Sequence, residues 1–112
     1  MISGIPQVEN MQSPSTNKPV ANQYIIKGID ACIIDDVTIN APEIFQSYET
    51  VICVWGYDAD TGNRVTYLDR DKWNYSNTTG KYLNLFLFDT ASGISKVRAK
   101  IKSGEYILTN LN

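Results

Sequence analysis

Histidine is absent from the 112 residues of this sequence. It is the commonest general base in enzymes, and the Ser-His and Cys-His nucleophile systems depend on it. The remaining acidic and basic side chains show no spacing that points to a convergent acid–base set. We therefore expect a protein that is not an enzyme and has no catalytic residues.

Cysteine is scarce as well. The two cysteines, Cys32 and Cys53, lie in apolar stretches and form no Cys-x-x-Cys pair. Without histidine, the sequence cannot supply the four nitrogen and sulfur ligands of a zinc site. A free thiol in such surroundings behaves as a small buried hydrophobe, although an even count also permits a disulfide. We expect neither a metal nor a cofactor.

A phosphate loop is also missing. Residues 77–81 read NTTGK, but that motif needs a glycine five residues before the Gly-Lys pair and a hydroxyl residue after the lysine. Those positions hold Tyr75 and Tyr82. The aspartates at 58, 60, 69 and 71 form no twelve-residue calcium loop, and they are typical of turns.

Long hydrophobic runs are absent too. No apolar run reaches the roughly 18–20 residues of a membrane helix, and the first residues lack the basic and apolar regions of a secretory signal. The hydrophobic share of 43% and the charged share of 20% are ordinary for a soluble globular chain. We expect one cytoplasmic domain that does not contact a membrane.

Charge is nearly balanced overall and uneven along the chain. Residues 1–60 hold two cations and eight carboxylates, whereas residues 61–112 hold eight cations and four carboxylates. The two halves could complement each other within the fold or form solvated faces. Alternatively, they could give the molecule an acidic and a basic face that steer a partner.

The pattern of apolar residues predicts a flexible N-terminal arm followed by a single domain. Residues 1–22 hold three of the four prolines and few apolar side chains, so this segment cannot offset the entropy of ordering. Residues 23–112 form the domain. Strands are expected at 24–26 and 31–39, joined by a turn at 27–30, and then at 48–57, 64–68 and 105–108. The residues around Pro42 are expected to interrupt the chain between the second and third of these strands.

Two helices are expected near residues 77–88 and 94–103, because each segment repeats apolar residues at helical spacing. The fold class is therefore α+β, with a mostly antiparallel sheet of four to five strands and two helices packed on one face. The expected core residues are Ile25, Ile52, Val54, Leu83, Phe86, Leu87, Val97 and Ile101.

The aromatic and hydroxyl residues at the start of the first helix are candidates for a binding site. Trp73 and Tyr75 precede this helix, and Thr78, Thr79 and Lys81 occupy its first turns. Aromatic side chains directly before a helix commonly pack against its first turns and fill the edge of the core, and we favour this structural interpretation. The alternative is a stacking and anion-binding surface that would suit a nucleotide or single-stranded nucleic acid.

Six ordered segments resemble a family of small, mostly uncharacterised proteins encoded by bacteriophages and gut mobile elements. They are residues 22–26 (NQYII), 45–50 (FQSYET), 67–69 (YLD), 73–82 (WNYSNTTGKY), 86–87 (FL) and 101–108 (IKSGEYIL). Residues 29–42 resemble an insertion, and residues 89–93 depart slightly from the family pattern. The resemblance implies a phage-encoded accessory protein that acts in the cytoplasm of a bacterial host.

By analogy with other small phage proteins, we expect this one to bind and inhibit a host or defence-system protein, such as a CRISPR effector or restriction enzyme. The alternatives are a module that binds single-stranded nucleic acid or a nucleotide, and a structural or virion-associated protein. Charged residues outside the apolar stripes are the candidate contacts for a protein partner. They are Asp35 and Asp36 in the insertion, and Lys96 and Lys100 on the second helix.

Overall fold

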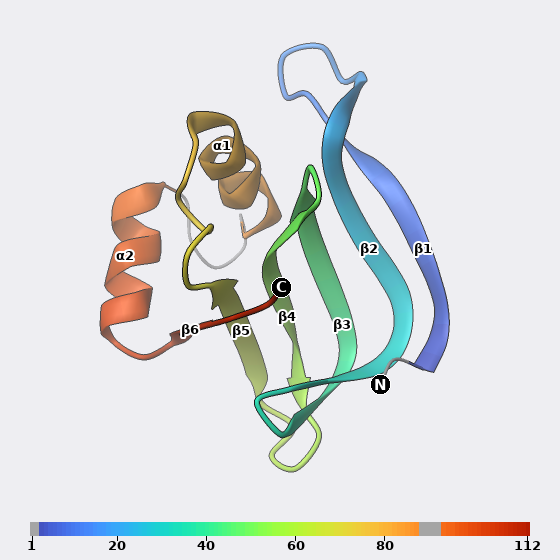
Figure 1. Cartoon of the computed structure of the whole chain (residues 1–112), viewed down its shortest axis with the longest axis vertical. Coiled ribbons are helices and arrows are strands. Elements are labelled where there is room, and N and C mark those ends of the chain that lie inside the picture. Colours follow the sequence, from blue (N-terminus) through green and yellow to red (C-terminus); the bar gives the residue numbers. More distant parts are fainter. Residues whose placement is uncertain (1–2, 88–92) are drawn as a thin grey trace.

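The computed structural model describes residues 3–87 and 93–112 and contains one six-stranded sheet and two helices (Figure 1). The elements in chain order are β1 (Ser3–Gln12), β2 (Pro19–Ile34), β3 (Val37–Ser47), β4 (Thr50–Asp58), β5 (Arg64–Asp69), α1 (Asn77–Phe86), α2 (Ile94–Lys102) and β6 (Tyr106–Thr109). The predicted α+β class is confirmed. The predicted helices agree with α1 and α2 to within two residues at each described end, and residue 88 lies outside the described part of the chain.

The strands follow one another across the sheet in chain order. Neighbouring strands are antiparallel from β1 to β5, whereas β5 and β6 are parallel. The prediction of four to five mostly antiparallel strands is therefore too low by at least one strand. It also missed the parallel pair, which arises because the segment with α1 and α2 carries the chain back before β6 begins.

The flexible arm expected over residues 1–22 differs most from the structure. Residues 3–12 form β1, which pairs with β2, and β2 already begins at Pro19. Every residue from Gly4 to Asn10 is exposed, whereas Met11 is buried in the core. An edge strand gains backbone hydrogen bonds on one side without burying its side chains. Its few apolar residues therefore form no pattern from which a strand could be predicted.

The hairpin turn predicted at residues 27–30 is also wrong. β2 runs through this segment with a register shift, and Gly28 adopts a φ of 82° there. The chain turns instead at Asp35 and Asp36, whose φ angles are 50° and 66°. Two consecutive positive φ angles are those of a type I′ turn, which joins antiparallel strands through two residues. β2 and β3 are therefore one long hairpin with these aspartates at its tip.

The expected interruption at Pro42 is an irregularity within β3 rather than a break. Ala41 has a φ of 49°, and the pairing with β4 shifts register between Asn40 and Glu43. β4 accommodates this bulge with a glycine: a Cβ on Gly56 would lie 2.8 Å from the Asn40 carbonyl oxygen. A larger residue at Gly56 would push the two strands apart.

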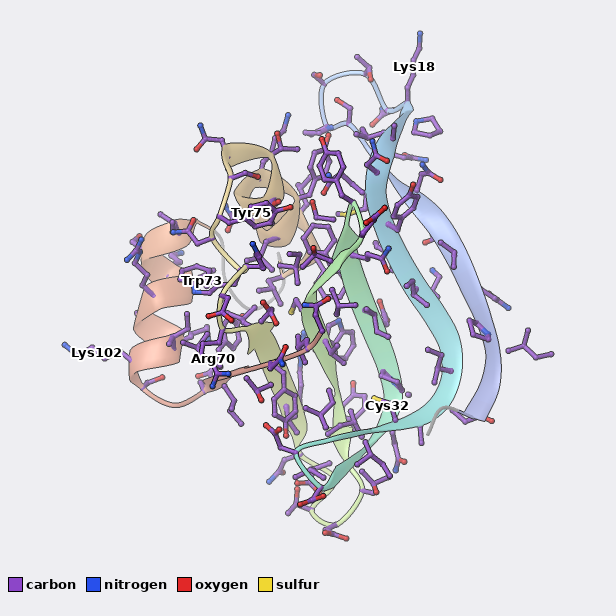
Figure 2. The ribbon with its side chains drawn as sticks, in the orientation of Figure 1. Lys18, Cys32, Arg70, Trp73, Tyr75 and Lys102 are labelled. Carbon is purple, nitrogen blue, oxygen red and sulfur yellow. The ribbon has the colours of Figure 1, made fainter. Side chains whose placement is uncertain are left out.

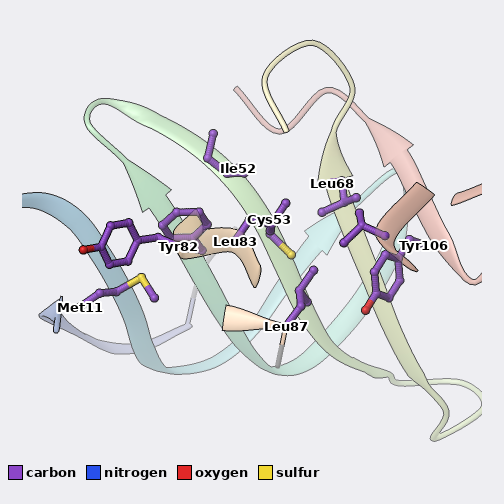
Figure 3. Packing of buried hydrophobic residues seen from close by; sticks show 10 residues of the cluster. Met11, Ile52, Cys53, Leu68, Tyr82, Leu83, Leu87 and Tyr106 are labelled. Atoms are coloured by element: carbon purple, nitrogen blue, oxygen red, sulfur yellow. The ribbon is translucent and has the colours of Figure 1, made fainter. Parts of the chain in front are cut away.

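Each face of the sheet has its own apolar cluster. On one face the helices supply Tyr82, Leu83, Leu87 and Val97, which pack on sheet residues that include Met11, Phe45, Cys53 and Leu68 (Figure 3). On the other face Cys32, Ile39, Val54 and Tyr67 form a second cluster. Of the eight predicted core residues, Ile52, Val54, Leu83, Leu87 and Val97 are buried. Ile25, Phe86 and Ile101 are partly buried against the first cluster.

We call the face opposite the helices the open face. The far end of the β2–β3 hairpin bends across the β4–β5 side of this face (Figure 1), which brings Cys32 and Ile39 onto Val54 and Tyr67. Burial raises the pKa of the Tyr67 hydroxyl, and the nearby carboxylate of Asp35 raises it further. The β1–β3 side of the open face has no such cover from the described residues.

Candidate functional site

Trp73 and Tyr75 lie in different environments. Trp73 is half-buried, packs against the helix-side core and carries the Arg98 guanidinium 5.7 Å from the centre of its ring. Tyr75 is 45% exposed, and the Lys72 ammonium lies 5.3 Å from its ring centre. Both rings therefore already have a cation as neighbour, an arrangement that stabilises each pair modestly.

Thr79 has a structural role. It is fully buried, and its hydroxyl lies 3.0 Å from that of Ser47 on β3 and accepts a hydrogen bond from Ser76. The Ser76 oxygen in turn accepts from the Thr79 backbone N–H, which caps α1. Thr78 and Lys81 are exposed. The residues predicted as one cluster are thus divided between the helix cap, the core edge and the surface.

The four charged candidates for a protein contact also differ from one another. Asp35 and Asp36 are exposed at the hairpin tip, and Lys96 is exposed on α2. Lys100 forms an ion pair with Glu105 and lies 5.7 Å from the ring centre of Tyr106. The hydrogen bond to Glu105 raises the pKa of Lys100. Lys100 is therefore engaged within the chain, and the other three side chains face solvent.

Charge is segregated between the sheet and the helices. We call residues 70–87 and 93–105 the helical layer; it holds seven cations and two carboxylates. Residues 3–69 hold three cations and nine carboxylates. Figure 2 shows Arg70, Trp73, Tyr75 and Lys102 together on the side where the helices lie. The uneven charge of the sequence therefore becomes a basic helical layer and an acidic sheet.

A hollow that was not expected from the sequence lies on the open face. Its volume is 680 Å³, and its lining comes from β1, β2, β3, the β3–β4 turn and the first residue of β4: Val8, Asn22, Tyr24, Ile26, Gln46, Tyr48, Glu49 and Thr50. Val8, Ile26 and Ile44 are register partners in a row across three strands. Val8 is 61% exposed, so part of this apolar row is open to solvent.

A second hollow of 430 Å³ adjoins the first. It is lined by Cys32, Ile33, Ile34, Asp35, Ile44, Val51, Val54, Asn110 and Leu111. The two hollows meet because Ile26 pairs with Ile44 and because Thr50 and Val51 are consecutive. We call the combined depression the open-face groove. It runs from the edge strand β1 to the hairpin tip and the C-terminal tail.

Tyr48 forms part of the rim of the open-face groove in a strained conformation. Its φ is 55°, its side chain is 52% exposed, and it occupies the two-residue turn between β3 and β4. Its N–H donates to the Asn22 carbonyl over 2.6 Å, and its own carbonyl accepts from the Gln46 amide over 2.8 Å. A bulky residue held at positive φ costs on the order of 1–3 kcal/mol, and such residues concentrate at functional sites.

Sequence reasoning placed Tyr48 inside a strand. The pair Tyr48-Glu49 contains no glycine, asparagine or proline, so the turn carries no local signal. The alternation of Tyr24 and Ile26 with Gln23 and Ile25 could have indicated a two-sided strand. It does not reveal which side the helices leave uncovered.

Within 3–87 and 93–112, no cluster of three or more cysteine, aspartate or glutamate side chains is arranged to hold a metal ion. In the same residues, no helix has the length and apolarity needed to cross a membrane.

Comparison with known proteins identifies the family. The model of a family of unknown function (DUF8033) matches residues 7–103. The chain belongs to this family. No curated protein and no solved structure matches it. The matched region includes every residue that lines the first hollow of the open-face groove and both helices, so the family extends over the sheet and the helical layer alike.

Proposed function

We propose that this chain is a phage-encoded accessory protein that binds and inhibits a host or defence-system protein, and that it has no enzymatic activity of its own. The open-face groove is its main contact surface. The observation that carries the proposal is the composition of this groove: an apolar floor with two tyrosines at its edge, on the one sheet face that the helices leave uncovered.

Several properties of the groove favour a macromolecular partner over a small ligand. It is lined from the strands β1 to β4, the two turns that join β2 to β3 and β3 to β4, and the C-terminal tail. Val8 at its β1 end is 61% exposed. Contiguous exposed apolar surface with a polar rim is typical of protein interaction sites. Tyrosine is enriched in the residues that contribute most to such interfaces. The phage origin and the inhibition rest on the sequence resemblance and on analogy.

The second candidate function is binding of single-stranded nucleic acid by the helical layer. Its seven cations against two carboxylates favour a polyanion. However, the exposed aromatic ring of Tyr75 is paired with Lys72, and the ring of Trp73 with Arg98, so bases would have to displace these cations to stack. We rank a virion-associated role third. A flexible N-terminal arm is the one sequence feature that favours this role, and residues 3–12 of that segment form the paired strand β1.

The test is affinity purification of the tagged protein from infected cells, with nuclease treatment and two matched variants. Tyr48→Gly alters the open-face groove, and Lys96→Ala with Lys102→Ala alters the helical layer. We expect one host protein to be recovered after nuclease treatment by the wild type and by the lysine variant, and to be lost with Tyr48→Gly. The purified host protein should lose activity when the wild type is added in stoichiometric amounts.

The opposite pattern supports the second candidate. If nuclease removes everything that is recovered, and if only the lysine variant fails to bind, the helical layer is the functional surface. Salt gives an independent check, because nucleic-acid binding weakens steeply between low and physiological salt. Binding through an apolar groove changes far less over this range.

A further inference from the structure

The open-face groove carries charge of one sign only. Among the described residues that line its two hollows, the charged side chains are Glu49 in the β3–β4 turn and Asp35 at the tip of the β2–β3 hairpin. Beyond Glu49, a further hollow adds Asp69 and Asp71, with Lys72 as its one cation. Across residues 3–69 carboxylates outnumber cations nine to three, so the wider surroundings reinforce this sign.

The apolar floor lies between these carboxylates. The row that starts at Val8 continues through the register partners Ile26 and Ile44 and ends where Val54, the next partner, is buried under the β2–β3 hairpin. Side chains on one face of neighbouring strands lie about 5 Å apart, so Val8, Ile26 and Ile44 offer neighbouring apolar contacts. Such a floor suits an extended chain that places alternate side chains against it.

The rim also has polar groups that suit a peptide backbone. The amides of Asn22, Gln46 and Asn110 and the hydroxyl of Thr50 line the same hollows. These side chains can donate to carbonyl oxygens or accept from N–H groups of an extended segment. Two hydrogen bonds to its backbone hold Tyr48 at positive φ despite the strain, which places an exposed aromatic side chain at the rim.

We propose that the open-face groove binds an extended, positively charged segment of the partner protein, with apolar side chains on the floor and lysine or arginine near Glu49 and Asp35. This inference rests on the proposed function and adds the chemistry of the partner. An acidic segment would place its negative charges near the carboxylates of Glu49 and Asp35 without compensation. This repulsion opposes its binding.

Two blocked peptides test the charge requirement directly. Both contain the same alternating centre of leucine, threonine and tyrosine; one has two lysines at each end and the other two glutamates. We expect the lysine peptide to bind the wild type at least about tenfold more tightly in fluorescence anisotropy. The double variant Glu49→Gln with Asp35→Asn should reduce this preference to less than about threefold. Both substitutions keep the side-chain size, and asparagine tolerates the positive φ of position 35.

Two controls separate binding from folding. Tyr48→Gly should weaken binding of the lysine peptide at least about tenfold, while urea denaturation shows no loss of stability, because glycine adopts positive φ without strain. Lys96→Gln, on the helical layer, should leave the affinity unchanged. The proposal is overturned if the wild type does not bind the lysine peptide, if it binds both peptides equally, or if the preference survives in the Glu49 and Asp35 double variant.

The two hypotheses fail in different experiments. If Tyr48→Gly abolishes recovery of a host protein but the peptides show no charge preference, the groove is the contact surface and its partner segment is not basic. If the lysine peptide binds as expected but no nuclease-resistant host protein depends on Tyr48, the groove recognises basic segments and the proposed inhibition of a host protein is wrong.

Discussion

At the scale of single residues, the hydroxyl group of Thr79 shows how a residue chosen as a binding candidate can be structural. It is fully buried between Ser47 of β3 and the cap residue Ser76. A hydroxyl cluster in the sequence is compatible with both an anion site and a helix cap, because the two use the same donors and acceptors. Only the long-range contact with Ser47 distinguishes them, and no local pattern could have predicted it.

The first prediction concerns this contact. Thr79→Val preserves the shape of the side chain but removes the hydroxyl that contacts the buried Ser47 hydroxyl and accepts the hydrogen bond from the Ser76 hydroxyl. We expect the free energy of unfolding to fall by about 1–3 kcal/mol, measured by urea denaturation. Thr78→Val is the matched control, because Thr78 is exposed on the same helix turn and should change stability by less than about 0.5 kcal/mol. Equal effects at the two positions would contradict the assigned role of Thr79.

The second prediction concerns the turn at Asp35 and Asp36, where both residues have positive φ. Replacing them with Asn-Gly, the pair that best suits a type I′ turn, should raise the free energy of unfolding by about 0.5–1 kcal/mol. Replacing both with alanine should lower it by about 1 kcal/mol or more, since alanine resists this conformation more strongly than aspartate does. In thermal unfolding, the melting temperature of the Asn-Gly variant should therefore lie above that of the wild type, and the melting temperature of the double-alanine variant should lie below it. A higher melting temperature for the alanine variant would show that the turn is formed differently.

At the scale of elements, the accuracy of sequence reasoning followed the strength of local signals. β4, β5, α1 and α2 have regular apolar periods or clear turn residues at their ends, and they were found to within about two residues. β1 was missed because an exposed edge strand has no apolar period. The long β2–β3 hairpin was divided wrongly, because Gly28 and Pro42 are usual marks of a turn and here belong to bulges within strands.

The third prediction tests the role of β1. If residues 1–12 formed a flexible arm, their removal would leave stability unchanged. In this structure their removal uncovers the edge of β2 and takes Met11 out of the core cluster. We expect the truncated chain to unfold at a lower temperature and to aggregate, as measured by thermal unfolding with light scattering. Amide hydrogen exchange on the intact chain gives the control: amides that pair β1 with β2 should exchange more slowly than those of Ser15 and Thr16 in the turn between these strands.

The open-face groove could not be predicted from the sequence, because local patterns do not show which face of a strand is left uncovered. Tyr24, Ile26, Ile44 and Tyr48 come from three segments, and each segment alone is compatible with a strand buried on both faces. Their exposure depends on two facts about packing: both helices lie on the other face, and the bent hairpin covers only the β4–β5 side. Both facts arise from contacts between distant parts of the chain.

At the scale of the whole molecule, the separation of charge matters more than the net charge of −2. Charges in solution are screened over about 8–10 Å at physiological salt. The molecule measures 40 × 34 × 23 Å, so its acidic sheet and basic helical layer act largely independently on a partner. A ligand near the helical layer meets a basic surface even though the isoelectric point computed from the sequence is about 4.9.

The fourth prediction follows from this independence. At neutral pH and low salt, the protein should be retained on heparin despite its net negative charge, and it should elute as salt approaches the physiological range. Lys96→Glu with Lys102→Glu should remove the retention, because both side chains are exposed on α2. Glu49→Gln with Asp35→Asn makes the net charge less negative but leaves the helical layer unaltered, so its elution should change little. If the groove variant shifted elution as strongly as the α2 variant, net charge rather than its separation would control binding, and the helical layer would not act as an independent basic surface.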